Sequence, residues 1–258
     1  MPEAVLKGRV ALVTGVSRRK GIGFAIAQRL AALGADVFIH SFRPYDVDRE
    51  WGADADGIAA LIATLAESGT KIAHAEGDFS DPAVPAQIMN AAVQTFGHVD
   101  ILVANHTYST MGNLEELTAS EIDRHLHINV RGTLLLAQAF AAQHHQPTGG
   151  RVILLTSGQQ LAPMPGELAY VASKGALQQL TLSLSAHLMP RGITVNTVNP
   201  GATDTGWADP ELYEFIRAAN PQGRWGQPED AARLIGWLAT DDAQWITGQT
   251  INSNGGGY

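Results

Sequence analysis

The sequence contains no cysteine. This absence excludes disulfides, thiolate metal sites and cysteine nucleophiles, and it is compatible with a reducing compartment. We therefore expect a cytoplasmic protein, and we predict no metal site.

Charge of either sign is scarce. Only 16% of the residues are charged, the formal net charge is -8, and the one short basic run is Arg18-Arg19-Lys20. An acidic chain has no overall attraction to phosphate backbones or anionic lipid, so we expect no nucleic-acid partner. Long apolar stretches of about 18 residues are missing, and residues 1–7 do not resemble a signal peptide. We therefore expect no membrane partner.

The length and hydrophobic content indicate a large core. The chain has 258 residues, of which 45% are hydrophobic. Doubly wound α/β folds reach this size as one unit, so we predict a single domain over residues 1–258. The low charged fraction also favours a surface covered by sister subunits, as in a homodimer or homotetramer.

Short apolar runs alternate with longer segments of helical period. This order predicts a three-layer, doubly wound Rossmann fold in which a seven-stranded parallel sheet lies between crossover helices. The predicted strands are Val10–Thr14, Asp36–Ser41, Lys71–Glu76, Ile101–Ala104, Val152–Thr156, Ile193–Val198 and Thr250–Asn252. The predicted helices are Ile22–Leu33, Ile58–Ser68, Pro82–Phe96, Ser120–His144, Leu168–Leu188 and Pro228–Ala239.

Two irregular segments follow predicted strand ends, where such folds bind ligands. They are 42–56 and 203–225, and we interpret the second as a candidate substrate lid. Trp207 and Trp225 either wall an apolar pocket in this lid or are ordinary surface or core residues.

A glycine-rich turn follows the first predicted strand. Gly15, Gly21 and Gly23 precede a helix that begins near Phe24. Glycine lets the backbone approach a ligand, and the first N–H groups of a helix have no internal partners. The turn therefore predicts a pyrophosphate site, the alternative being an ordinary connection between strand and helix.

The end of the second strand indicates which dinucleotide binds. An NAD site usually places a carboxylate there, whereas an NADP site needs cations and no acid. The strand ends in Ser41 and is followed by Arg43, while Asp46 comes later. Arg43 and Arg18 could clasp a 2'-phosphate and Ser41 could donate to it, so we favour NADP(H) over NAD(H). On the alternative interpretation the arginines are solvated loop charges.

Tyr170 and Lys174 form the strongest chemical pattern. Four residues apart on a predicted helix, their Cβ atoms should lie about 5–6 Å apart on one face. A neighbouring cation and a positively charged cofactor ring would lower the pKa of a phenol, which is ordinarily ~10, and so fit it for proton transfer. Ser157, directly after a predicted strand, could donate to a substrate oxygen.

These motifs resemble short-chain dehydrogenases/reductases over nearly the whole chain. The glycine turn resembles the family's Thr-Gly-x-x-x-Gly-x-Gly. Between Gly15 and Gly21 the chain has five residues, where the family pattern has x-x-x. The resemblance implies that Ser157, Tyr170 and Lys174 are catalytic, and that Asn129 kinks a helix and holds a water for proton relay. Asn129 could also be a buried helix amide with partners of its own. The cofactor contacts that we predict are Gly15, Ser17, Arg18, Ile22, Gly23, Ser41, Arg43, Asp78, Asn105, Tyr170, Lys174, Pro200, Gly201, Thr203 and Thr205.

One segment departs from the family pattern. Where the family usually has Asn-Asn-Ala-Gly, the chain reads Ala104-Asn105-His106-Thr107, and only Asn105 matches. His106 therefore either points toward substrate or is structural.

These residues imply hydride transfer between NADP(H) and a carbonyl or alcohol, with Tyr170 as the proton donor. The small-molecule substrate is either a 3-oxoacyl thioester or a small ketone, sugar or secondary alcohol. The rival interpretation is a regulator that senses NADP(H) without turnover. A sensor would not need Ser157, Tyr170 and Lys174, which favours the enzyme, and a scaffold role explains none of these residues.

Overall fold

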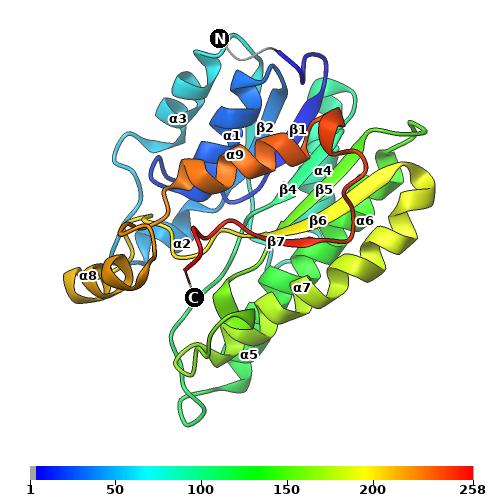
Figure 1. The fold of residues 1–258 in the computed structure, drawn as a ribbon. Helices are drawn as coiled ribbons and strands as arrows, with labels where there is room; N and C mark the ends of the chain where they lie inside the picture. Colours follow the sequence, from blue (N-terminus) through cyan, green and yellow to red (C-terminus); the bar gives the residue numbers. More distant parts are fainter. Residues whose placement is uncertain (1–3, 258) are drawn as a thin grey trace.

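Seven parallel strands form one sheet in the computed structural model, which describes residues 4–257. The order is β3-β2-β1-β4-β5-β6-β7. The chain therefore adds β2 and β3 on one side of β1 and then crosses over to add β4 to β7 on the other side. The predicted fold class is confirmed (Figure 1). The strand ends differ from the predicted ones by at most two residues. The strands are β1 Val10–Val13, β2 Asp36–Ser41, β3 Ile72–Glu76, β4 Ile101–Ala104, β5 Gly150–Leu155, β6 Ile193–Asn199 and β7 Thr250–Asn252.

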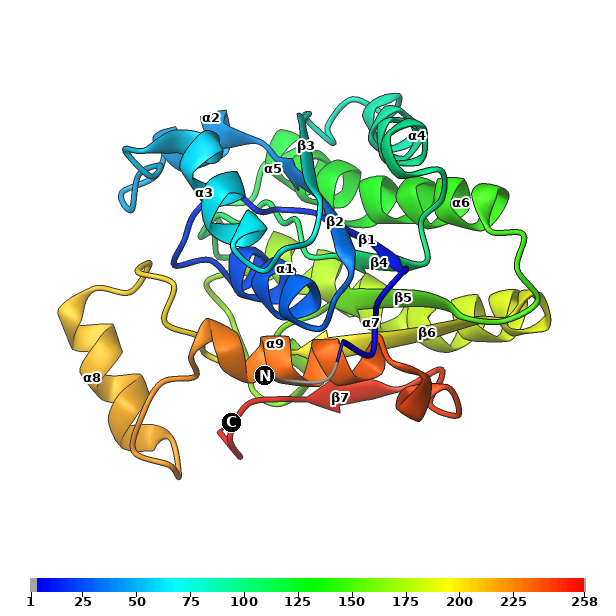
Figure 2. The same ribbon diagram turned by 90° about the horizontal axis from the view of Figure 1, so that it is seen from above.

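Helices cover both faces of the sheet (Figure 2). One face is buried under α1 (Ile22–Ala32), α3 (Gly57–Ala66) and α9 (Pro228–Leu238). The other packs against α4 (Val84–Phe96), α6 (Thr133–Gln143) and α7 (Leu168–Leu188). No helix within residues 4–257 combines the length and apolar content needed to cross a membrane.

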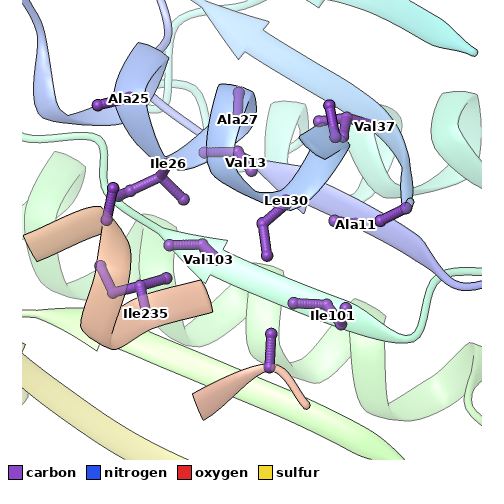
Figure 3. Close-up of a cluster of buried hydrophobic side chains, with 14 of the residues drawn as sticks. Ala11, Val13, Ala25, Ile26, Ala27, Leu30, Val37, Ile101, Val103 and Ile235 are labelled. Atoms are coloured by element: carbon purple, nitrogen blue, oxygen red, sulfur yellow. The ribbon is translucent and has the colours of Figure 1, made fainter. Parts of the chain in front are cut away.

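The first core layer shows why α1 lies where it does. Ile26 and Leu30, one helical turn apart, both point from α1 to the sheet and are fully buried (Figure 3). Ile235 from α9 joins the same cluster. A Cβ atom on Gly236 would lie 2.8 Å from Arg29 Cγ, so the bare glycine lets the two helices approach closely. Burial of one such aliphatic side chain contributes about 1.5–3 kcal/mol.

The prediction of one continuous α-helix over Ser120–His144 is wrong in the middle of that range. The structure divides it into α5 (Ala119–His125), a π-helical segment over Leu126–Gly132, and α6. A π turn changes the backbone hydrogen-bond pattern without interrupting the run of helical residues, so periodicity alone does not reveal it. Asn129 lies inside this segment, which fits the helix distortion that the family resemblance implied.

The irregular segments 42–56 and 203–225 each contain a short helix that was not predicted from the sequence. These are α2 (Arg43–Val47) and α8 (Pro210–Ala219), and α8 stands apart from the sheet (Figure 1). The local signal was present for α8, because Asp209 accepts from Leu212 N at 2.8 Å and caps the helix. Trp225 is 1% exposed and stacks on Tyr213, whereas Trp207 is 44% exposed. Trp225 therefore forms the core of this segment, and of the two tryptophans Trp207 is the one that reaches the surface.

Candidate active site

The glycine-rich turn lies at the carboxyl edge of the sheet, beside the ends of the paired strands β1 and β4. Gly15 has φ +71°, a left-handed conformation that favours glycine. A Cβ atom on Gly23 would lie 2.6 Å from the Asn105 amide nitrogen and closer still to the Gly15 carbonyl. Gly21 begins α1 with no side-chain cap and no acidic residue in the first turn. The free N–H groups and the bare backbone fit a dinucleotide pyrophosphate.

Asn105 joins this turn to the end of β4. Its amide nitrogen donates to Thr14 O at 2.9 Å and to Gly15 O at 3.1 Å. The Asn105 amide thereby fixes the backbone of the glycine-rich turn at Thr14 and Gly15. A bound cofactor would contact this backbone. The expected cofactor contact of Asn105 stays a prediction.

His106 is a structural residue in this arrangement. Its Nδ1 lies 2.8 Å from Thr14 Oγ1, and its Nε2 lies 3.2 Å from Ile128 O in the π segment. A carbonyl can only accept, so Nε2 carries the proton and Nδ1 accepts from the threonine hydroxyl. Burial lowers the pKa of His106 well below its ordinary value. The residue therefore connects β1 to the π segment and does not face substrate.

A second buried histidine supports the same turn. His40 Nε2 donates to Gly77 O at 2.8 Å, and its Nδ1 accepts from Gly15 N at 3.4 Å. Its ring stacks on Phe79, which packs edge-on against His106. Burial lowers the pKa of His40 to about 4, so the ring is neutral at physiological pH.

The basic run after Gly15 binds the two flanking loops. Arg18 Nε lies 3.1 Å from Asp46 Oδ1, and its NH1 donates to Thr205 O at 3.0 Å. Lys20 Nζ lies 2.7 Å from Asp204 Oδ1. The predicted phosphate contact of Arg18 must therefore share this guanidinium with Asp46. The sequence did not predict that Asp46 and Asp204 are the partners of this basic run, because no local pattern connects positions so far apart in the chain.

The residues expected around a 2'-phosphate lie near the end of β2. Ser41 Oγ is 2.8 Å from His74 Nε2, and Arg43 is exposed as the first residue of α2. Asp46, the next acid along the chain, is buried against Arg18 and Trp51, so its charge is already compensated. Glu76 of β3 is paired with Ser41 across the sheet. Asp78 follows β3 and accepts from Ser80 N.

Ser157, Tyr170 and Lys174 gather at the ends of β5 and α7. Ser157 lies just beyond β5, and its side chain is near enough to the Tyr170 phenol to lower the pKa of that group. Lys174 Nζ lies 5.7 Å from the centroid of the Tyr170 ring and donates to Leu155 O at 3.1 Å. Lys174 is 3% exposed, so the ammonium is held in place beside the phenol. The structure thus brings the three predicted catalytic residues together.

The pKa of the phenol differs from the expectation. Burial raises the pKa of Tyr170 to about 12, opposed by the Ser157 hydrogen bond and reinforced by the negative charge of Glu167. Burial also lowers the pKa of Lys174 to about 8. Burial therefore dominates the pKa of Tyr170, and the lowering that the Tyr-x-x-x-Lys spacing predicts is not seen among the protein's own groups.

Both ends of the Asn129 amide have protein partners. Its Oδ1 accepts from Tyr108 N at 2.7 Å, and its Nδ2 donates to Tyr108 O and to Ser173 Oγ, each at 2.9 Å. Its main-chain carbonyl accepts from Thr133 Oγ1. The amide therefore joins the loop after β4 to the α7 residue next to Lys174, which is the buried-amide alternative. A water held at Asn129 stays a prediction.

The Pro200-Gly201 segment turns sharply after β6. Gly201 has φ +68°, and a Cβ atom on it would lie 2.5 Å from Asn254 Cβ. Thr203 is 4% exposed and its hydroxyl donates to Gly201 O at 3.2 Å, while Thr205 O accepts from Arg18. These hydroxyl and carbonyl groups already have partners in the loop, and their cofactor contacts stay predictions.

The chain is similar to known proteins over nearly its whole length. A family model described as enoyl-(acyl carrier protein) reductase matches residues 15–257. The chain is 40% identical to the uncharacterized oxidoreductase YjdA of Bacillus subtilis, covering 96% of each chain, and 32% identical to versicolorin reductase 1 of Aspergillus parasiticus, covering 98% and 97%. A short chain dehydrogenase from Burkholderia cenocepacia, solved in complex with NADP, superposes with a TM-score of 0.87 at 35% identity, covering 97% of this chain and 98% of that one.

Proposed function

Because the chain belongs to the short-chain dehydrogenase/reductase family, we propose that it interconverts a ketone and a secondary alcohol with NADP(H) as the cofactor. The observation that carries the proposal is the position of Lys174 Nζ, 5.7 Å from the Tyr170 ring beside Ser157 at the carboxyl edge of the sheet.

The cofactor site would use the turn and the loops around it. When bound, the nicotinamide supplies or accepts the hydride. The N–H groups at the start of α1 face the pyrophosphate, and Arg18, Ser41 and Arg43 serve the 2'-phosphate. Support for NADP(H) comes from the missing acid at the end of β2 and from the NADP complex of the Burkholderia relative. The other proposed contacts are Gly15, Ser17, Ile22, Gly23, Asp78, Asn105, Pro200, Gly201, Thr203 and Thr205.

The catalytic residues divide the proton chemistry among them. Ser157 and Tyr170 donate to the carbonyl oxygen, and Tyr170 delivers its proton as the oxygen becomes an alkoxide. A phenol with a pKa of about 12 carries its proton at neutral pH, and it is still a stronger acid than an alcohol, so it can protonate the alkoxide. Lys174 faces the phenol and the ribose, and Asn129 holds a water that returns a proton to the site.

Residues 203–225 act as the lid over the substrate in this proposal. Trp207, partly exposed and hydrogen bonded to Thr203 O, supplies an apolar surface. We also propose a homo-oligomer, dimer or tetramer, in the cytoplasm. It is supported by large apolar side chains that stay in water on the isolated chain, such as Trp245 at 93% and Leu182 at 68% exposure.

The test is turnover with defined substrates. The purified protein is incubated with NADPH or NADH and a panel containing small ketones, keto sugars and 3-oxoacyl thioesters, and nicotinamide absorbance is followed. Reduction of at least one ketone, faster with NADPH than with NADH, is the expected result. Tight NADPH binding without any turnover would favour the sensor, and reduction of thioesters alone would identify the 3-oxoacyl substrate.

A further inference from the structure

Ser157 lies at the point where the chain leaves β5. Thr156 N still donates to Val198 O in β6, at 2.9 Å. The next N–H group along a strand points to the opposite neighbour, and on that side β4 has already ended at Ala104. Ser157 N instead donates to Gln159 Oε1 at 3.2 Å. A side chain, and not the sheet, therefore holds the main chain of the predicted catalytic serine.

The amide of Gln159 is itself anchored. Its Nε2 donates to Thr156 Oγ1 at 2.9 Å and to Gln178 Oε1 at 3.0 Å. Thr156 is 3% exposed, and its hydroxyl in turn donates to Lys174 O at 3.0 Å. These partners fix which end of the amide faces Ser157, because only the oxygen of Gln159 can accept from a main-chain N–H. Rotation of the amide would break all of these hydrogen bonds.

A chain of amide side chains supports Gln159 from the side away from Ser157. Gln178 Nε2 donates to Gln160 Oε1, and Gln160 Nε2 donates to Asn252 Oδ1 at 2.8 Å. Asn199 Nδ2, from β6, donates to the same Asn252 oxygen at 3.0 Å. The support of Gln159 thus extends from α7 to two strands of the sheet, which limits how far its amide can move.

We propose that Gln159 is a positioning residue that sets the direction of the Ser157 hydroxyl during hydride transfer. The hydrogen bond to Ser157 N fixes the backbone from which this hydroxyl extends. Misplacement of a reacting group by about 1 Å can lower a rate roughly 100-fold. Gln159 acts through Ser157 and needs no contact with substrate or cofactor. This inference rests on the proposed function, in which Ser157 donates to the carbonyl oxygen.

The experiment compares wild type with Gln159→Met, which keeps the length of the side chain and removes its hydrogen bonds. It uses NADPH and the ketone that the wild-type protein reduces fastest. We expect kcat and kcat/KM to fall together, roughly 10- to 100-fold, because the lost stabilisation is confined to the transition state. The Kd for NADPH should stay within about twofold. Gln179→Met, at an exposed position on α7, is the control and should keep the wild-type kcat.

A double-mutant cycle separates positioning from a general structural effect. In Ser157→Ala there is no hydroxyl left to position, so adding Gln159→Met should change the residual kcat by less than about twofold. A merely structural loss would lower kcat by the same factor with and without the serine. If Gln159→Met is unfolded, Gln178→Met takes its place in the cycle. That variant removes a partner of Gln159 Nε2 and should lower kcat less, again only when Ser157 is present.

The outcomes are distinct. Equal kcat in wild type and a folded Gln159→Met overturns the inference and leaves the proposed function standing, and so does the same loss in both backgrounds of the cycle. A fall in kcat/KM that comes entirely from KM would make Gln159 a substrate contact and also overturns the inference. If the wild-type protein reduces no ketone at all, the proposed function falls and the inference falls with it.

Discussion

Lys20 and Asp204 join the glycine-rich turn to the segment after β6, with Nζ 2.7 Å from Oδ1. A partly exposed ion pair contributes only about 0.2–1 kcal/mol. Its position matters more than its strength, because it connects the turn expected to bind pyrophosphate with residues 203–225. Together with Arg18 and Thr205, it ties this segment to the start of α1.

Breaking this pair should loosen residues 203–225 without unfolding the protein. In Asp204→Asn we expect chymotrypsin to cleave at Phe215, which is 70% exposed, up to about fivefold faster than in wild type. The thermal midpoint should change by only a few degrees. Arg233→Gln, which removes a surface pair within α9, is the matched control and should keep the wild-type cleavage rate. Equal cleavage of Asp204→Asn and wild type would show that the pair does not hold the segment.

Removing the phenol hydroxyl should abolish catalysis and spare binding. In Tyr170→Phe we expect turnover to fall by roughly two or more orders of magnitude, the scale of lost acid catalysis. The Kd for NADPH, measured by fluorescence titration, should stay within about twofold, because Lys174 is still held by Leu155 O. Tyr213→Phe, on α8, should retain full turnover. Near-normal turnover of Tyr170→Phe would remove the tyrosine from the mechanism.

A methyl group on Gly23 should destroy the cofactor turn. Its Cβ would lie 2.6 Å from the Asn105 amide nitrogen, so turn and helix must separate. We expect Gly23→Ala to weaken NADPH binding at least about tenfold, since displaced N–H groups no longer face the pyrophosphate. Gly175→Ala is the control: nothing lies within 4 Å of the new methyl group, and alanine should stabilise α7 by about 0.5–1 kcal/mol. Isothermal titration and thermal melting of both variants provide the comparison.

The buried histidines should make the fold sensitive to acid. The pKa of His40 is lowered to about 4 by burial, and the pKa of His106 also lies well below 6.5. Below pH 6.5 the unfolded chain binds protons that the folded protein does not, so stability falls with decreasing pH until the folded pKa is reached. The loss should be about 1.4 kcal/mol per pH unit for each histidine.

Urea unfolding between pH 7.5 and 4.5 checks this dependence. His40→Gln should show a shallower loss of stability than wild type, because one of the groups that takes up a proton on unfolding is gone. His127→Gln, at an exposed position, should keep the wild-type slope. A wild-type stability that is constant over this range would contradict the assignment of neutral, buried histidines.

The elements most reliably predicted were those with a strong apolar pattern. The buried run Ile101–Ala104 and the helix Leu168–Leu188 were predicted with the bounds that the structure has. The prediction failed where an α-helix and a π-helix have the same sequence periodicity. The π segment Leu126–Gly132 has the same helical character in sequence as its neighbours. It is accompanied by tertiary contacts that the sequence does not show, because Asn129 and His106 satisfy backbone groups of other elements.

The candidate site shows the same division. The spacing of Tyr170 and Lys174 placed them on one face, since four residues make about one turn of any α-helix. The roles of Arg18 and Lys20 could not be predicted in this way. Their carboxylate partners, Asp46 and Asp204, lie on loops whose positions depend on the whole sheet.

The sequence by itself determined the strand and helix order, and with it the edge of the sheet at which the catalytic groups meet, because apolar periodicity and glycine act locally. Only the tertiary structure decided the protonation of those groups and the partners of the loops. Desolvation raises the Tyr170 pKa and lowers the Lys174 pKa, and it arises from every element packed around them, which no short stretch of sequence encodes.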